Sequence, residues 1–447
     1  MMDSKLIREK YIELFEKSKF NLPGKNISWL KDLREDAINQ FKKTGLPDTT
    51  VEEWNVYPYK NLTNNYFSFA DEKSKSIDLY NIEPKAPNCI ARLIFHNGRM
   101  IKLELDKLPE GVMINSLSYF LENIPEVIKG KIKPINKHYE TRLSNVIDAR
   151  SQSIVSLNAA FHKDGAVIFI KKNIEVPGYI ELLNLTSTEC NLMDHMRSVI
   201  ILEEDSKCNI IEKTLSIPSK KNLVFSSKVT DINLSRNSFL SFIRLIPGDI
   251  DNTSINSIHS DIEENAIYNS TSFIFSKGDA REEIRANLNG AKAVANINGL
   301  VLGKDKSKNE LLTKVKHIAK STRSNQNVRV ILNGKSRGSF QGKIRVEKEA
   351  DDTVANMSGK SLLLDQLARI NAKPELEILA DDVSCSHGVT VGSLDPEQLF
   401  YLCSRGIPNK EAKKMLISAF SEVVFENLDS ALKEIIKKLV LDYHGEY

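Results

Sequence analysis

The strongest constraint on the fold is a turn signature that recurs along the middle of the chain. The signature is a polar residue, then Asp, Asn or Gly, then a small residue. Its small residue lies at positions 206, 238, 266 and 291, which are separated by 32, 28 and 25 residues. Recurrence at this length predicts stacked β coils, as in a β-helix or solenoid. A β-sandwich also has many short strands and stays open as an alternative. The β-like runs flanking such turns are 166–170, 198–202, 239–243, 272–275, 328–332 and 343–346.

The segment 291–300 carries small residues on one face. Three alanines, an isoleucine and a glycine occupy the odd positions 291–299, and mostly larger or polar residues occupy the even positions. Because side chains alternate between the two faces of a strand, this segment has one face of small residues. Such a face suits close stacking between coils, which favours the β-helix.

Both ends of the chain have helical patterns instead. Between residues 6 and 41 apolar residues recur at helical spacing, and a Gly-Leu-Pro segment at 45–47 ends the run. Near the other end, Asp395 and Pro396 are typical of an N-cap and a first helical position, and two further helical runs follow. We divide the chain into an N-terminal helical region (1–60), a mixed region (61–150), a β-helix core (151–394) and a C-terminal helical domain (395–447).

Composition narrows the classes of function. The 447 residues carry 62 Lys and Arg against 59 Asp and Glu, a net charge of +3, whereas nucleic-acid binding usually needs a strong basic excess. The five cysteines include no C-x-x-C pair, which favours a reducing compartment over a disulfide framework. Charges interrupt residues 1–20, and no stretch approaches about 18 apolar residues. We predict a cytoplasmic protein with neither nucleic-acid nor membrane partners.

Two short patterns resemble catalytic motifs and fail on inspection. Gly334-Lys335-Ser336 looks like the end of a phosphate-binding loop, but Arg329 stands where the earlier glycine is required. The same glycine begins a G-x-S-x-G pattern at 334–338, which needs a following helix, whereas strand-like segments flank it on both sides. A tight turn in a solenoid explains the pattern better. We therefore predict that the chain is not an enzyme.

A cysteine and a histidine two residues apart form the one pattern with metal-binding chemistry. If the segment 381–388 is extended, Cys385 and His387 lie on the same face. A thiolate and an imidazole side by side are ligands for iron or zinc, but two ligands do not complete a site. Two interpretations stay open: half of a shared metal site, or a small buried cysteine beside a hydrogen-bonded histidine. Spacing alone favours the second.

At this motif the sequence resembles a known family. The segments 374–378, 380–383, 385–392, 399–402 and 404–407 are similar to the signature of the SufB/SufD family of iron–sulfur cluster assembly proteins. Segments 45–47, 52–54, 289–300 and 338–344 resemble other motifs of that family. The SufD branch is the closer match, because SufB-type chains carry Glu-His-Glu-Ala where this chain has Cys385-Ser386-His387-Gly388. They also carry a functional cysteine where this chain has Ser361.

The resemblance implies a mainly β protein with flanking α, in which a right-handed β-helix core lies between N-terminal and C-terminal helical regions. It implies a non-catalytic scaffold subunit in a complex with SufB and the ATPase SufC, which contributes to iron acquisition and cluster assembly at the SufB interface. The isolated chain would hold no tightly bound cofactor, and iron or an Fe–S cluster would be bound only transiently in the complex. A homodimer of the isolated chain is also possible on this view.

The resemblance also implies roles for particular residues. Cys385 and His387 become metal ligands shared with SufB, and the stripe of Leu416, Phe420 and Val423 becomes the contact with SufC. Cys403 departs from the SufD pattern and is expected to be a packing thiol on the apolar side of a helix. Two alternatives to the scaffold function are a metal-free subunit that only stabilises the complex, and a β-helical carbohydrate-active enzyme.

Overall fold

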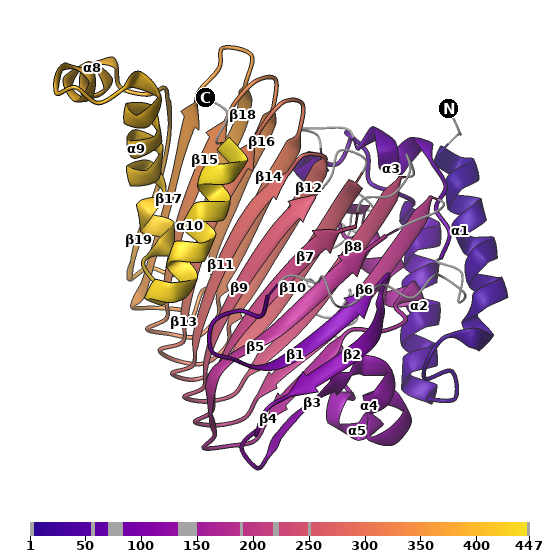
Figure 1. The fold of residues 1–447 in the computed structure, drawn as a ribbon. Coiled ribbons are helices and arrows are strands. Elements are labelled where there is room, and N and C mark those ends of the chain that lie inside the picture. The colour runs from indigo at the N-terminus through magenta and orange to yellow at the C-terminus, as the bar shows by residue number, and fades with distance from the viewer. Residues whose placement is uncertain are drawn as a thin grey trace.

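The structure is a computed structural model that describes residues 4–54, 59–69, 84–132, 150–187, 191–217, 223–248 and 252–444. Two parallel sheets dominate it, and helices lie at both ends of the chain (Figure 1). The prediction of a β-helix is confirmed, and the β-sandwich alternative is wrong because every strand from β4 onward pairs in parallel with its sheet neighbours among β4–β19.

The N-terminal helices form where the sequence places its apolar stripes. Helix α1 (Ser4–Ser18) buries Ile7, Tyr11 and Phe15, which follow one another at intervals of one helical turn. Helix α2 (Ser28–Thr44) ends at Gly45, whose positive φ of 69° turns the chain away from the helix axis. The shorter helical elements upstream of residue 162 are η1 (Lys19–Asn21), η2 (Glu52–Trp54), α3 (Lys60–Asn64), α4 (Leu117–Asn123), α5 (Pro125–Ile128) and α7 (Ser153–Phe161).

From β4 onward, successive strands of the chain alternate between the two sheets, so each turn of the β-helix adds one strand to each sheet. Sheet A contains β3 (Val112–Ser116), β4 (Ala166–Ile170), β6 (Leu192–Leu202), β8 (Val224–Leu234), β10 (Asn252–Ile262), β12 (Asp279–Leu288), β14 (Lys308–His317), β16 (Arg337–Val346) and β18 (Arg369–Ile378). Sheet B contains β1 (Cys89–His96), β2 (Arg99–Leu105), β5 (Glu175–Thr186), β7 (Lys207–Ser216), β9 (Phe239–Gly248), β11 (Ile267–Ser276), β13 (Val294–Gly303), β15 (Arg323–Leu332), β17 (Thr353–Leu363) and β19 (Val383–Gly392).

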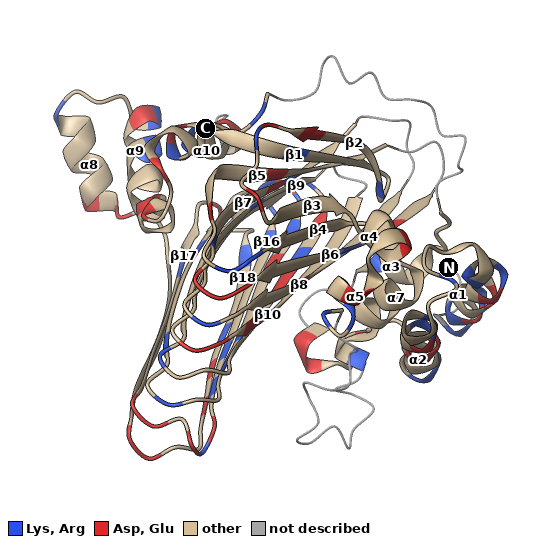
Figure 2. Cartoon of the chain, turned by 90° about the horizontal axis from the view of Figure 1, so that it is seen from below, with Lys and Arg blue, Asp and Glu red and all other residues tan. Residues whose placement is uncertain are grey.

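The recurring turn signature forms a ladder along one side of the β-helix. Asp205, Asn237 and Asn265 all have positive φ, between 55° and 58°, which Asn and Asp tolerate better than most residues. The Asn237 side chain donates to Asp205 over 2.9 Å, and Asn265 donates to Asn237 over 3.1 Å. The fourth turn differs from the predicted one, because Lys292 and not Gly290 adopts the positive φ. Charged residues of both signs line these turns (Figure 2).

The two ends of the β-helix differ. At the upstream end, β2 pairs antiparallel with β1, and β3 pairs antiparallel with β4. Strands β1, β2 and β3 come from the region 61–150, so both sheets include strands upstream of residue 151. At the downstream end, β18 and β19 are the last strands of sheets A and B, and no described strand pairs with their outer edges.

The C-terminal helices cover part of sheet B and then project from it (Figure 1). Helix α10 (Ser430–His444) and η4 (Glu422–Phe425) pack through Leu432, Val424 and Phe425 on the outer face of the sheet. Helix α9 (Asn409–Ser421) buries Ala412 and Ile417. Helix α8 (Pro396–Ser404) buries none of its residues and stands away from the β-helix. Within the described residues, the helices are all too short or too polar to cross a membrane.

Candidate functional site

Strand β19 positions the predicted metal ligands at the downstream end of the β-helix. We call this the open end, because no described strand pairs with the outer edges of β18 and β19. Its register with β17 places Cys385 opposite Ala355 and His387 opposite Met357. Ala355 and Met357 are both buried in the core between the two sheets. Cys385 and His387 therefore share the inward face of the last strand, as the sequence predicted. The intervening Ser386 faces outward, and its hydroxyl donates to the Asn356 side chain over 2.7 Å.

The two candidate ligands differ in environment. Cys385 is half-buried against the core, and this burial raises the pKa of its thiol above the ordinary value. The thiol is therefore protonated at neutral pH, and a metal or a neighbouring cation must displace the proton to obtain a thiolate ligand. His387 is exposed to solvent at the edge of the sheet. Among the described residues no group of three or more His, Cys, Asp or Glu side chains is arranged to hold a metal ion.

The open end exposes core residues as well as backbone. Ile370 and Leu376 of β18 and Val383 of β19 pack on the core from the last turn and are only partly buried. Ile378 and Leu379, at the end of β18, are 40% and 47% exposed. The end of the β-helix therefore presents apolar side chains between two strand edges.

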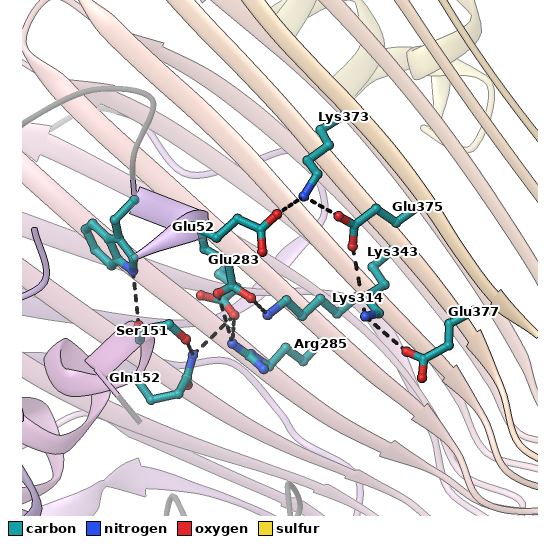
Figure 3. Close-up of polar contacts among 12 residues, drawn as sticks. Glu52, Ser151, Gln152, Glu283, Arg285, Lys314, Lys343, Lys373, Glu375 and Glu377 are labelled. Atoms are coloured by element: carbon teal, nitrogen blue, oxygen red, sulfur yellow. Dashed lines mark hydrogen bonds and ion pairs between the residues drawn. The ribbon is translucent and has the colours of Figure 1, made fainter. Parts of the chain in front are cut away.

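Charged side chains form a network on the outer face of sheet A beside this end (Figure 3). Lys343 lies 3.0 Å from Glu377, and Arg345 lies 2.6 Å from the same carboxylate. Lys373 contacts both Glu375 and Glu52, so η2 of the N-terminal region is tied to the last strand of the sheet. This network was not predicted from the sequence. The alternation of charged residues at 373, 375 and 377 is the signal that would have indicated an exposed strand face.

Further along the same face, Glu53 contacts Lys314 and lies 4.0 Å from Arg285. Burial opposes ionisation of Glu53, but the charges of Lys314 and Arg285 outweigh it and lower its pKa to about 2. Glu53 is therefore ionised at neutral pH and bridges the N-terminal region to strands β12 and β14.

The residues predicted to contact SufC are partly buried by packing within the chain itself. Phe420 and Val423 pack against the cluster that covers sheet B, and the Arg329 guanidinium lies 5.7 Å from the Phe420 ring. Leu416 is half-buried. The more exposed apolar side chains of this region are Phe400 and Tyr401 of α8 and Met415 of α9, at 74%, 57% and 50% exposure.

Cys403, expected to be a packing thiol, lies on this projecting helix α8, which has no buried residue. Cys403 is half-buried, and the Asn409 side chain donates to its sulfur over 3.9 Å. The expected packing role is therefore not observed.

These features define a two-sheet β-helix with flanking helical regions and a pair of metal-ligating residue types at its open end. Residues 184–420 match the family model described as "SUF system FeS cluster assembly, SufBD core domain", and residues 5–182 match "SufBD protein N-terminal region". The chain belongs to the SufBD family of iron–sulfur cluster assembly proteins.

Comparison with individual curated relatives indicates which branch of the family the chain resembles. The iron–sulfur cluster assembly protein SufD of Escherichia coli is 29% identical over 415 residues, which cover 90% of each chain. SufD of Bacillus subtilis is 23% identical over 92% of this chain and 94% of its own. A SufBD family protein of Pyrococcus horikoshii is 21% identical over 98% of this chain and 97% of its own. The resemblance to the SufD branch is thereby confirmed, and it favours cluster assembly over the carbohydrate-active enzyme.

Proposed function

We propose that the chain is a non-catalytic subunit of a cytoplasmic iron–sulfur cluster assembly complex with SufB and SufC. The observation that carries the proposal is the open end, where β18 and β19 present strand edges beside partly exposed core residues. An exposed edge of this kind is a template for pairing with another chain. The likeness to proteins named SufD supports SufB, a member of the same family, as the partner whose own strands continue the sheets.

The position of Cys385 and His387 supports a role in receiving iron. Both face inward on β19, so a partner that continues the sheets brings its own residues beside them. The partner then supplies the remaining ligands, and iron or a nascent Fe–S cluster is cargo held transiently at the interface. His387 is the better candidate for the first contact, because it is the more exposed of the two.

SufC, the ATPase, is proposed to dock on the projecting C-terminal helices. Helix α8 buries none of its residues and exposes Phe400 and Tyr401 at its centre. Two exposed aromatic residues on one short helix are suitable anchors for a partner, because aromatic side chains contribute strongly to binding energy at interfaces. Phe420 and Val423, which pack partly on this chain's own core, would lie at the rim of such a contact.

A metal-free subunit that only stabilises the complex is the second candidate. The half-buried position of Cys385 favours it, since a small thiol also fits as a core residue of the last turn. In that case the isolated chain, with its uncovered end, would also form a homodimer through β18 and β19. The two candidates differ in whether His387 is needed for clusters in an intact complex.

The test compares three substitutions on one strand in the complex co-expressed with SufB and SufC. His387→Ala and Cys385→Ser change the inward face, and Ser386→Ala is the matched control on the outward face. Complex formation is measured by co-purification, and iron and sulfide are measured in the purified complex after reconstitution. Loss of a metal ligand should lower iron affinity at least as much as loss of a second-shell partner, about tenfold or more.

We expect His387→Ala to leave the complex intact and to lower its cluster content sharply, with a smaller loss for Cys385→Ser and none for Ser386→Ala. Normal cluster content in the His387→Ala complex would leave the metal-free candidate as the function. Failure of the unchanged chain to co-purify with SufB would refute the proposed pairing at the open end.

A further inference from the structure

A cavity lies in the N-terminal helical region, away from the open end. It has a volume of about 340 Å³, within the range of small-molecule sites. Its walls come from the start of α1, the end of α2 with the segment that follows, Trp54 of η2, the start and body of α3, and Arg150, three residues before α7. The lining includes residues 45–47 and Trp54, which belong to segments that resemble family motifs, but no part of the proposed function accounts for this cavity.

Positive charge predominates among the residues that line it. Lys5 and Arg8 of α1 and Arg150 supply three cations, and Asp48 is the one carboxylate in the lining. The Asp48 carboxylate already accepts hydrogen bonds from the Thr50 backbone N–H, over 2.9 Å, and from Arg150, over 3.3 Å. The lining therefore has a net charge of +2, which favours an anion.

The two arginines are placed to bind such an anion. Arg8 crosses the chain at Gly45, where an added Cβ would lie 3.4 Å from the Arg8 Cδ. Arg8 forms no hydrogen bond or ion pair with any residue in the described part of the chain. The Nε of Arg150 is buried and also has no hydrogen-bond partner there. A guanidinium prefers two parallel hydrogen bonds to a carboxylate or a phosphate, and the Thr49 hydroxyl adds a polar group to the lining. The hydroxyls of Thr44 and Thr63 already donate to the backbone carbonyls of Gln40 and Tyr59.

Another part of the lining is aromatic and apolar. Trp54 and Tyr59 line the cavity with their rings 5.5 Å apart in an edge-to-face arrangement. The Trp54 indole N–H donates to the Ser151 backbone carbonyl over 3.2 Å, and the Arg281 guanidinium lies 4.0 Å from the ring. Trp54 is thus held in place from two sides. An apolar wall of fixed rings beside a cationic wall suits a ligand with a flat or apolar part next to its anion.

We infer that this cavity binds a small phosphate-bearing molecule whose phosphate contacts Arg8 and Arg150 and whose ring lies against the Trp54–Tyr59 wall. Adenosine monophosphate is the probe that combines both parts, and inorganic phosphate is the probe for the anion alone. Because the cavity includes no residue of β18, β19 or α8, its occupancy does not depend on the proposed function.

The chain has two tryptophans, so Trp29→Phe leaves Trp54 as the single reporter inside the cavity. Each probe is titrated into this full-length variant while tryptophan fluorescence is followed, and calorimetry on the unsubstituted chain provides a second readout. Arg8→Gln is the test variant, because Arg8 contributes to no other described ion pair or hydrogen bond. Lys42→Gln, an exposed lysine near the end of α2 that does not line the cavity, is the matched control for charge.

We expect saturable binding of adenosine monophosphate that is tighter than that of inorganic phosphate. Removal of one charge-assisted contact should weaken the nucleotide about tenfold or more in Arg8→Gln, with less than about a twofold change in Lys42→Gln. Absence of saturable binding of either probe up to millimolar concentration overturns the inference. Equal weakening by both substitutions, or equal affinity for both probes, also overturns it, because the arginine or the aromatic wall would then play no specific part.

Discussion

The ion pair between Arg281 and Glu310 is the most informative place to test how the N-terminal region is held on the β-helix. Their side chains are 0% and 2% exposed, and Arg281 Nη1 lies 2.7 Å from Glu310 Oε2. Arg281 also donates to the Glu53 backbone carbonyl over 2.9 Å and lies 4.0 Å from the Trp54 ring. One buried guanidinium thus joins β12, β14 and η2.

Replacing Arg281 should lower stability because it leaves the buried Glu310 carboxylate without a positively charged partner. Burial already raises the pKa of Glu310 above its ordinary value, and the charge of Arg281 opposes that rise. In Arg281→Met, Glu310 becomes a buried carboxylate without its counter-ion, and breaking such a pair costs about 3–5 kcal/mol. Loss of the contact with Trp54 adds roughly 1 kcal/mol. We expect the free energy of unfolding of the N-terminal region to fall by about 4–6 kcal/mol.

Urea unfolding followed by Trp54 fluorescence in the Trp29→Phe background measures this effect. The double variant Arg281→Met/Glu310→Gln removes the charge that would otherwise be stranded, so it should recover most of the lost stability. Arg236→Met is the matched control, because the Arg236–Glu204 pair is exposed and should change the transition little. The reasoning is refuted if the single variant costs less than about 1 kcal/mol, or if the double variant is as unstable as the single one.

Two further predictions concern the interior and the C-terminal helices. Burial raises the pKa of Asp194 to about 6 despite the charge of Lys228, so the folded chain binds the proton more tightly and loses stability as pH rises from about 4 to about 6. Asp194→Asn should remove this loss and increase the free energy of unfolding at pH 7 by at most roughly 3 kcal/mol, and an unchanged pH profile in urea melts would contradict it. Phe400→Ser combined with Tyr401→Ser should reduce capture of SufC at least about tenfold, whereas Ile435→Ser on α10 should not. Equal capture by all of these variants would place the SufC contact elsewhere.

The fold was largely predictable because its determinants are local. The Asp and Asn residues of the turn ladder indicate where each coil bends, and the backbone φ at Asp205, Asn237 and Asn265 confirms three of the four turns. The prediction of the fourth turn was wrong in position, because Asn289-Gly290 resembles the other turns in sequence but Lys292 adopts the positive φ. Gly290 is needed for another reason: an added Cβ there would lie 1.9 Å from the Glu264 backbone nitrogen. The requirement for glycine at position 290 therefore arises from contact with the neighbouring coil, which no local sequence pattern indicates.

The candidate site was only half predictable. Spacing by two residues places Cys385 and His387 on one face, but the choice of face depends on the register with β17. Likewise, the apolar periodicity of the C-terminal helices does not distinguish a face that packs on sheet B from one that stays exposed. Phe425, which is 1% exposed and packs 5.3 Å from the Phe273 ring, and Phe400, which is 74% exposed, look alike in the sequence.

The difference between the two ends of the β-helix is the physical reason to expect a partner at the downstream end. At the upstream end, sheet A ends at β3, which has only five residues, and sheet B ends at β2, whose pairing with β1 has an irregular register between Ile94 and Phe95. Helix α4 packs on the outer face of sheet A through Phe120 and Leu121. Short edge strands and irregular pairing are two ways in which proteins limit edge-to-edge association. The downstream end has neither device, although the same chain possesses helices long enough to cover it, and these lie on sheet B or project away. An edge left uncovered while α8 stands free beside it is the arrangement expected of a subunit whose last coil is completed by another protein.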